Sequence, residues 1–136
     1  MSEVVDHVGI RVSDVAASRA LYEAALAELG FAVLSEGTFE GDAYVVFGRG
    51  ENDDFSIHSV GTKPGCDRVT TGAHVAFPAP DADAVDRWHA AALRSGGTDN
   101  GAPGLRPEYT GRYYAAFVLD LDGNNVEAVF HAPADG

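Results

Sequence analysis

The chain contains an internal repeat in which residues that shape a strand and a helix recur 67 positions later. Five pairs share this spacing: His7 and His74, Val8 and Val75, Asp14 and Asp81, Leu26 and Leu93, and Gly30 and Gly97. These residue types suit a strand, a helix cap, an apolar helix stripe and a helix stop, so their common spacing indicates a duplicated folding unit. One unit of about 60 residues buries too little surface to be stable alone, so the two are expected to pack together.

Each unit is expected to fold as β-α-β-β-β. Alternating apolar residues predict strands, and an Asp cap followed by a 3.6-residue apolar stripe predicts each helix. The predicted strands cover residues 4–12, 31–35, 43–48 and 55–60, then 72–78, 113–119 and 125–130, and the predicted helices cover residues 14–30 and 81–95. Residues 96–111 are irregular and are expected to keep only a short strand and to form a lid or pocket wall. The modules are assigned to residues 1–60 and 72–136, and residues 61–71 form the linker.

The charge of the chain limits its partners. Nine basic and 21 acidic residues give a net charge of −12, which argues against nucleic acid and anionic membranes, because both require Lys and Arg to meet phosphate. An acid-biased surface that serves solubility explains the same charge. Cys66 is the only cysteine, so an internal disulfide is excluded. With no secretory signal and no apolar run of about 18 residues, a cytoplasmic protein is expected.

The segment from Arg112 to His131 predicts a hairpin with an Asp-Gly turn and a carboxylate in an apolar strand. In its second strand, Val126 and Ala128 share one face and Glu127 lies on the other. An unpaired buried carboxylate is costly, so Glu127 requires a partner.

Histidines are the candidate partners. His7 and His74 lie on the face of each unit's first strand that is opposite the bulky apolar residues, and each is followed two positions later by a small residue, Gly9 or Ala76. Small neighbours leave space for a ligand, so this face is expected to line a cavity.

A third histidine falls in the last strand of the first unit. His58 precedes Glu127 by 69 residues, and the two are interpreted as matched positions of the repeat. Two aromatic pairs show a spacing of 70 residues: Tyr44 with Tyr114, and Phe47 with Phe117. If a pseudo-twofold axis relates the units, His7, His58, His74 and Glu127 converge and suit Zn²⁺, Ni²⁺, Fe²⁺, Mn²⁺ or Co²⁺. Hydrogen-bonded structural histidines are the alternative.

Three stretches, DHVGIRVSDVAASRALYEAAL, GAHVAF and YYAAFVLDLDGNNVEAVFH, resemble the vicinal oxygen chelate superfamily, which contains glyoxalase I, fosfomycin-resistance enzymes, extradiol dioxygenases and bleomycin-resistance proteins. The similarity covers nearly the whole chain. It implies an α+β fold: two βαβββ modules form one compact domain, an open barrel-like mixed sheet around a metal with helices on the outside.

The resemblance also implies roles. First-strand ligands fall on His7 and His74, and last-strand ligands on His58 and Glu127, which would also serve as the catalytic base. Glyoxalase I usually has Glu where this chain has His58. Extradiol dioxygenases use two His and one Glu, which matches His7, His74 and Glu127, although they are usually longer chains. Bleomycin-binding members lack the metal and use an acidic groove on a dimer.

The expected function is that of a small glyoxalase-like metalloenzyme, a lyase or isomerase type, that binds a substrate through vicinal oxygens. A metal-free sequestration protein of the bleomycin-resistance type and an extradiol-type dioxygenase are the alternatives. Candidate substrate contacts are Arg11, Arg106, Tyr109 and Tyr113. A homodimer is expected, because the edge strands of such half-barrels need to be covered.

Overall fold

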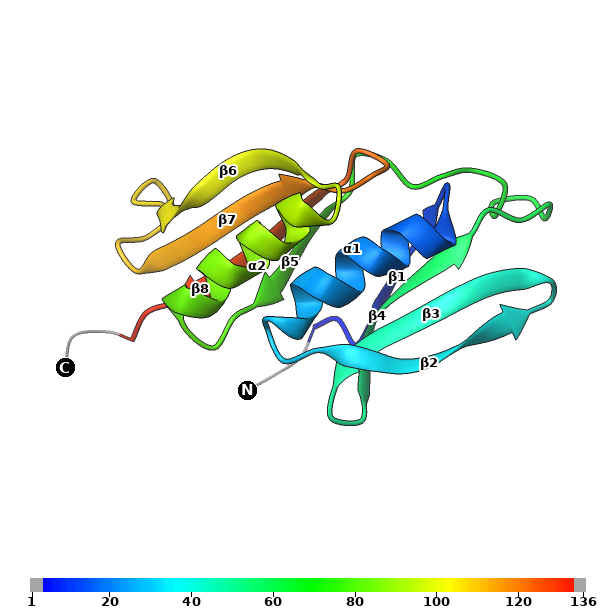
Figure 1. Ribbon diagram of the computed structural model, residues 1–136, viewed down its shortest axis with the longest axis horizontal. Helices are drawn as coiled ribbons and strands as arrows, with labels where there is room; N and C mark the ends of the chain where they lie inside the picture. Colours follow the sequence, from blue (N-terminus) through cyan, green and yellow to red (C-terminus); the bar gives the residue numbers. More distant parts are fainter. Residues whose placement is uncertain (1–3, 134–136) are drawn as a thin grey trace.

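The structure, a computed structural model, describes residues 4–133 and contains two βαβββ modules (Figure 1). The first module consists of β1 (Val8–Val12), α1 (Val15–Ala27), β2 (Ala32–Phe39), β3 (Asp42–Arg49) and β4 (Asn52–Ser59). The second consists of β5 (His74–Pro78), α2 (Ala82–Arg94), β6 (Thr98–Leu105), β7 (Tyr113–Leu119) and β8 (Asn125–His131). The predicted α+β fold of paired modules is confirmed. The first three and last three residues of the predicted modules lie outside the described residues.

The two helices begin in the same way. The Asp14 carboxylate accepts a hydrogen bond from the Ala17 backbone nitrogen at 3.0 Å, and the Asp81 carboxylate accepts one from the Ala84 nitrogen at 2.8 Å. Each helix has 13 residues, so the 67-residue spacing holds from cap to end. Neither helix of the described chain has the length and apolar character needed to span a membrane.

The strands form two four-stranded mixed sheets. Their orders are β1-β4-β3-β2 and β5-β8-β7-β6, with the first pair of each sheet parallel. Among the described residues no strand ladder joins β1 to β5, so each sheet has an unpaired edge where its parallel pair ends. The sheets therefore stay open and are not closed into a barrel.

The modules share one hydrophobic core on the helix side of both sheets. Helices α1 and α2 pack against each other, and Figure 1 shows them side by side in front of the strands. Phe77 of β5 meets Phe55 of β4 edge-to-face at 5.1 Å, within the same cluster of buried residues. The helix-facing sides of both sheets are thus used for contact within the chain, and the opposite sides remain for other contacts.

Strand β6 differs from the prediction. A short strand was expected in residues 96–111, whereas Thr98–Leu105 forms an eight-residue strand paired with β7. The ladder shifts register around Gly101 and Gly104, so β6 is bulged. These glycines obscure the alternation in the sequence, which explains why the strand was underestimated.

The register of the last strands corrects the repeat. Gly9 pairs with Ser56, and its counterpart Ala76 pairs with Glu127. Ser56 therefore occupies the position equivalent to Glu127, 71 residues before it, and the predicted equivalence of His58 and Glu127 is wrong. His58 lies two residues farther along the same face of β4.

The aromatic pairs at a spacing of 70 are also not equivalent. Phe47 is fully buried in the core on the helix side, whereas Phe117 lies in a small cluster on the other face of its sheet. Tyr114 packs against the core, whereas Tyr44 lines a cavity. An error of one residue in strand register moves every side chain to the opposite face.

Candidate functional site

The site is best formed in the second module, where His74 and Glu127 meet. His74 begins β5 and Glu127 lies in the neighbouring parallel strand β8, opposite Ala76. Because side chains alternate along a strand, both point away from the helices. Their Nε2 and Oε1 atoms are 2.7 Å apart. Glu127 is 1% exposed, whereas the His74 side chain is 55% exposed, so the pair is accessible from the histidine side.

The second oxygen of Glu127 is held by Tyr113. The Tyr113 hydroxyl, on β7, donates a short hydrogen bond to Glu127 Oε2. Burial, and then the bonded carboxylate, raise the pKa of Tyr113 well above its ordinary value, so the hydroxyl keeps its proton and remains a donor. Each oxygen of this buried carboxylate thus has one side-chain partner.

This donor set fits a divalent metal ion. An imidazole nitrogen and a carboxylate oxygen are ligands for Zn²⁺ and for the neighbouring divalent metals. Two ligands that each lie about 2.1 Å from a metal are about 3.0 Å apart at an octahedral angle and about 3.4 Å apart at a tetrahedral angle. His74 Nε2 and Glu127 Oε1, at 2.7 Å, have to give up their hydrogen bond and move apart to such a distance to accept an ion.

His7 lies at the start of the first module, immediately before β1. Its Nδ1 is 2.8 Å from the Asp6 carboxylate, and Asp53 lies near it. The bond to Asp6, followed by the charge of Asp53, raises the pKa of this exposed imidazole. These three residues are the one group of three or more His, Cys, Asp or Glu within ligand distance in residues 4–133, with ligand atoms within 4.8 Å of one another.

His58 folds back along β4 toward the position that corresponds to Glu127. Its Nε2 is 2.8 Å from Ser56 Oγ. A Cβ atom on Gly9 would lie 3.1 Å from His58 Nε2 and 2.9 Å from Ser56 Oγ, so the glycine makes room for this ring. Burial, and then the nearby Arg11 charge, lower the pKa of His58, which favours the neutral imidazole.

The four predicted ligands do not gather within one chain. His74 and Glu127 form a pair, whereas His7 bonds to Asp6 and His58 bonds to Ser56. No three of the four predicted ligands have ligand atoms within 4.8 Å of one another. The metal role of the set stays a prediction.

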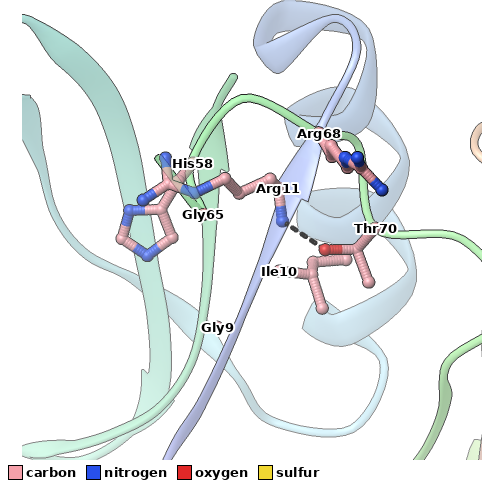
Figure 2. A pocket seen from close by; sticks show the side chains of 7 residues that line it. All are labelled: Gly9, Ile10, Arg11, His58, Gly65, Arg68 and Thr70. Atoms are coloured by element: carbon pink, nitrogen blue, oxygen red, sulfur yellow. Dashed lines mark hydrogen bonds between the residues drawn. The ribbon is translucent and has the colours of Figure 1, made fainter. Parts of the chain in front are cut away.

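Arg11 and His58 line a cavity of about 340 Å³ on the first module (Figure 2). Figure 2 shows the Arg11 side chain reaching toward the His58 ring, while Thr70 of the linker bonds the Arg11 backbone nitrogen. The guanidinium donates to the Ser59 carbonyl at 2.7 Å and to Cys66 Sγ at 3.1 Å. Neither of these two acceptors is a carboxylate, and the one ion pair of Arg11 within residues 4–133 is with Asp42, at 3.6 Å.

Arg106 and Tyr109 border another cavity of about 340 Å³, on the second module. Arg106 lies 5.3 Å from the centroid of the Phe117 ring and donates to two backbone carbonyls of β6. Tyr109 is 58% exposed and meets Tyr113 edge-on at 4.8 Å. Arg106 and Tyr109 line this cavity, whereas the Tyr113 hydroxyl is hydrogen-bonded to Glu127.

Ser56 and Asp53 were not identified from the sequence. Ser56 and His58 are two residues apart in the same strand, so their side chains lie on the same face. This spacing was the signal in the sequence that could have predicted their hydrogen bond. Asp53 belongs to an acidic segment whose sequence is typical of a solvent-exposed turn. Its proximity to His7 depends on how β4 begins beside β1.

Comparisons with known proteins agree with this fold. Residues 4–128 match the Glyoxalase/Bleomycin resistance protein/Dioxygenase superfamily. A glyoxalase/bleomycin resistance protein from Albidiferax ferrireducens T118 is 25% identical with a TM-score of 0.72, over 94% of this chain and 99% of that one. A protein of similar description from Frankia sp. EAN1pec is 18% identical with a TM-score of 0.66, over 97% and 100%. No curated protein matches the chain significantly.

Glyoxalase I from Zea mays, which is a longer chain, is similar in structure. It is 22% identical with a TM-score of 0.67, over 94% of this chain but only 44% of its own. At this identity the likeness concerns the fold, and the present chain spans less than half of the maize enzyme. The match over residues 4–128, together with the paired βαβββ modules, means that the chain belongs to the Glyoxalase/Bleomycin resistance protein/Dioxygenase superfamily.

Proposed function

We propose that the protein is a divalent-metal-dependent enzyme that acts on a small substrate with vicinal oxygen atoms. The observation that carries this proposal is the pair formed by His74 and Glu127, 2.7 Å apart in a site that opens to solvent on the histidine side. A buried carboxylate beside an accessible imidazole is expensive to maintain for stability alone and is typical of functional sites.

The remaining ligands, in this proposal, come from a second copy of the chain. Within one chain no three of His7, His58, His74 and Glu127 come within ligand distance of one another, and the sheet edges formed by β1 and β5 are unpaired in the part of the chain that the structure describes. Pairing the first module of one copy with the second module of another covers these edges and can bring the four side chains together. The proposed active unit is therefore a homodimer.

A bound divalent metal would supply Lewis-acid stabilisation of negative charge on substrate oxygen atoms. His74 and Glu127 would hold the ion, and the face that carries them would exclude bulk water once the first module of the other copy covers it. Glu127 Oε1 is the proposed proton acceptor, because Oε2 is already bonded to Tyr113. Arg11, whose guanidinium lies 3.6 Å from the Asp42 carboxylate, is the proposed contact for an anionic group of the substrate.

Metal uptake tests this proposal directly. The purified protein is loaded with Co²⁺, freed of excess metal and analysed by elemental analysis, beside His74→Ala and Glu127→Gln. About one equivalent per chain is expected in the wild type and less than a tenth in either variant, because each removes one of the two donors that the second module supplies. Arg87→Met is the matched control, since this side chain lies on the exposed face of α2 and, within residues 4–133, forms an ion pair with Glu28 alone. Equal uptake by all four proteins contradicts the proposed ligands.

Mixing two inactivated chains tests the dimer. One chain carries His7→Ala with His58→Ala, the other carries His74→Ala with Glu127→Gln, and mixed dimers are isolated through two affinity tags. A site shared between chains restores one intact set per mixed dimer, so one Co²⁺ per two chains is expected, although neither parent binds metal. A mixed dimer that binds none contradicts the shared site.

Metal-free sequestration of a cationic ligand is the second candidate. A cavity of about 330 Å³ is lined by Phe39, Tyr44 and Asp42 together with His58 and Arg11, and Phe39 is 71% exposed. Aromatic rings suit an organic cation, which would compete with Arg11 for the Asp42 carboxylate. A wild-type protein that takes up less than a tenth of an equivalent of Co²⁺ yet binds an aromatic cation in calorimetry favours this function over the enzyme.

A further inference from the structure

Tyr113 makes the one hydrogen bond, among residues 4–133, to the Glu127 oxygen that faces away from His74. Its hydroxyl donates to Oε2, while Oε1 lies 2.7 Å from His74 Nε2. Tyr113 was expected to contact the substrate, but its hydroxyl already donates a hydrogen bond to the Glu127 carboxylate. The two oxygens of Glu127 are therefore not equivalent.

The Tyr113 ring is itself in contact with two other rings. Tyr109 packs edge-on at 4.8 Å and His131 packs edge-on at 5.1 Å, and the backbone of Tyr113 pairs with that of His131 across the β7–β8 ladder. A hydroxyl on a ring held in this way has little freedom, so the bonded carboxylate is held in one orientation.

We infer that Tyr113 is a positioning residue, whose hydroxyl occupies Glu127 Oε2 so that Oε1 alone is presented to the ion and to the substrate. This inference rests on the proposed metal function and assigns the coordination mode within it. Glu127 then acts as a single-oxygen ligand, because turning the carboxylate to offer both oxygens breaks the bond to Tyr113. Oε1 is also the one carboxylate atom that can exchange between the ion and a proton.

The neighbouring tyrosine provides a matched control. Tyr114 lies on the opposite face of β7, and its hydroxyl donates to the Asp86 carboxylate at 2.7 Å. Tyr113→Phe and Tyr114→Phe each remove one hydroxyl from the same strand and one bond to a carboxylate. Only the first of these bonds reaches the proposed site.

Co²⁺ affinity and the visible absorption of the Co²⁺ protein test the inference without any substrate. Hydrogen-bond partners of metal ligands typically contribute 10- to 100-fold in affinity. Tyr113→Phe is thus expected to raise the Co²⁺ Kd 10- to 100-fold and to change the d–d bands, because the freed carboxylate can bind through both oxygens. Tyr114→Phe is expected to keep the wild-type Kd and spectrum.

The possible failures can be told apart. A Tyr113→Phe protein with wild-type Kd and spectrum overturns the positioning role and leaves the metal function intact. Equal losses in both variants also overturn it, because they indicate a general disturbance of β7. A wild-type protein that binds no Co²⁺ overturns the metal function and this inference together. Melting temperatures of the metal-free variants check that both are folded.

Discussion

The hydroxyl of Tyr22 on α1 donates a 2.6 Å hydrogen bond to Asp120 Oδ2, in the turn between β7 and β8, and so ties the first module to the second. Both side chains are buried. The other oxygen of Asp120 accepts from the backbone nitrogens of Asp122 and Asn124, each at 2.9 Å. The carboxylate thus shapes its own turn and joins it to the opposite module, which fixes how the modules sit in one chain.

Tyr22→Phe is expected to lower the free energy of unfolding by about 1–3 kcal/mol, because it leaves a buried carboxylate without one of its donors. Urea unfolding followed by circular dichroism measures the change. Tyr114→Phe is the control, because the Tyr114 hydroxyl bonds to a carboxylate at the surface. It is expected to lower the free energy of unfolding by less than about 1 kcal/mol. Equal costs for the two variants contradict the role assigned to the Tyr22 bond.

Asn124 extends this connection to the linker. Its fully buried amide donates to the Thr70 carbonyl at 2.9 Å and accepts from the Ala73 nitrogen at 3.0 Å. Asn124→Ala leaves both backbone groups without this partner. It is expected to lower the free energy of unfolding, measured in the same urea experiment, by more than about 2 kcal/mol. Asn100→Ala removes an exposed hydrogen bond between the amides of Asn100 and Asn125, and it is expected to change the free energy of unfolding by less than about 0.5 kcal/mol. A small effect of Asn124→Ala means that the linker is held by other contacts.

The early part of each module could be predicted because local signals agree there. Asp14 and Asp81 cap their helices as the repeat indicates, and the helices have equal length. The later strands could not be aligned from the sequence, because loops and bulges change the spacing by single residues. That small change decides which face a side chain takes, as the positions of Phe47 and Phe117 illustrate.

The candidate site was predictable to a similar extent. The proximity of His74 and Glu127 agrees with the expectation that these two residues share a site, and it arises because β5 and β8 are neighbouring strands of one module. The distance from these residues to His7 depends instead on how the modules pack. That packing is set by contacts such as Tyr22 with Asp120, which are far apart in sequence and carry no local pattern.

Gly9→Ala tests whether the glycine makes room for His58. The added Cβ would lie 2.9 Å from Ser56 Oγ and 3.1 Å from His58 Nε2, so the hydrogen bond between these two side chains is expected to break. The free energy of unfolding is expected to change by less than about 1.5 kcal/mol, because both side chains can rotate away. The NMR resonance of the His58 Cε1 proton reports the displacement. Gly111→Ala, where no atom lies within 4 Å of the new Cβ, is expected to leave that resonance unchanged.

The protonation of His58 gives a prediction with a definite sign. Burial and the Arg11 charge lower its pKa below 6.5 in the folded protein, whereas the unfolded chain has the ordinary value. Between the two values the unfolded chain binds the additional proton. The contribution of His58 to stability is therefore fully present above pH 6.5 and declines as the pH falls toward the folded pKa.

NMR titration of the histidine Cε1 protons measures this directly. His58 is expected to titrate below 6.5 and His7, beside Asp6 and Asp53, above it in the same spectra. Arg11→Met removes the nearby positive charge and is expected to raise the pKa of His58 partway toward 6.5, because the burial remains. Arg68→Met is the matched control, since Arg68 lines the same cavity but is not among the groups that shift His58. If Arg11→Met leaves the titration unchanged while Arg68→Met shifts it, the charge that keeps His58 neutral belongs to the linker and not to β1.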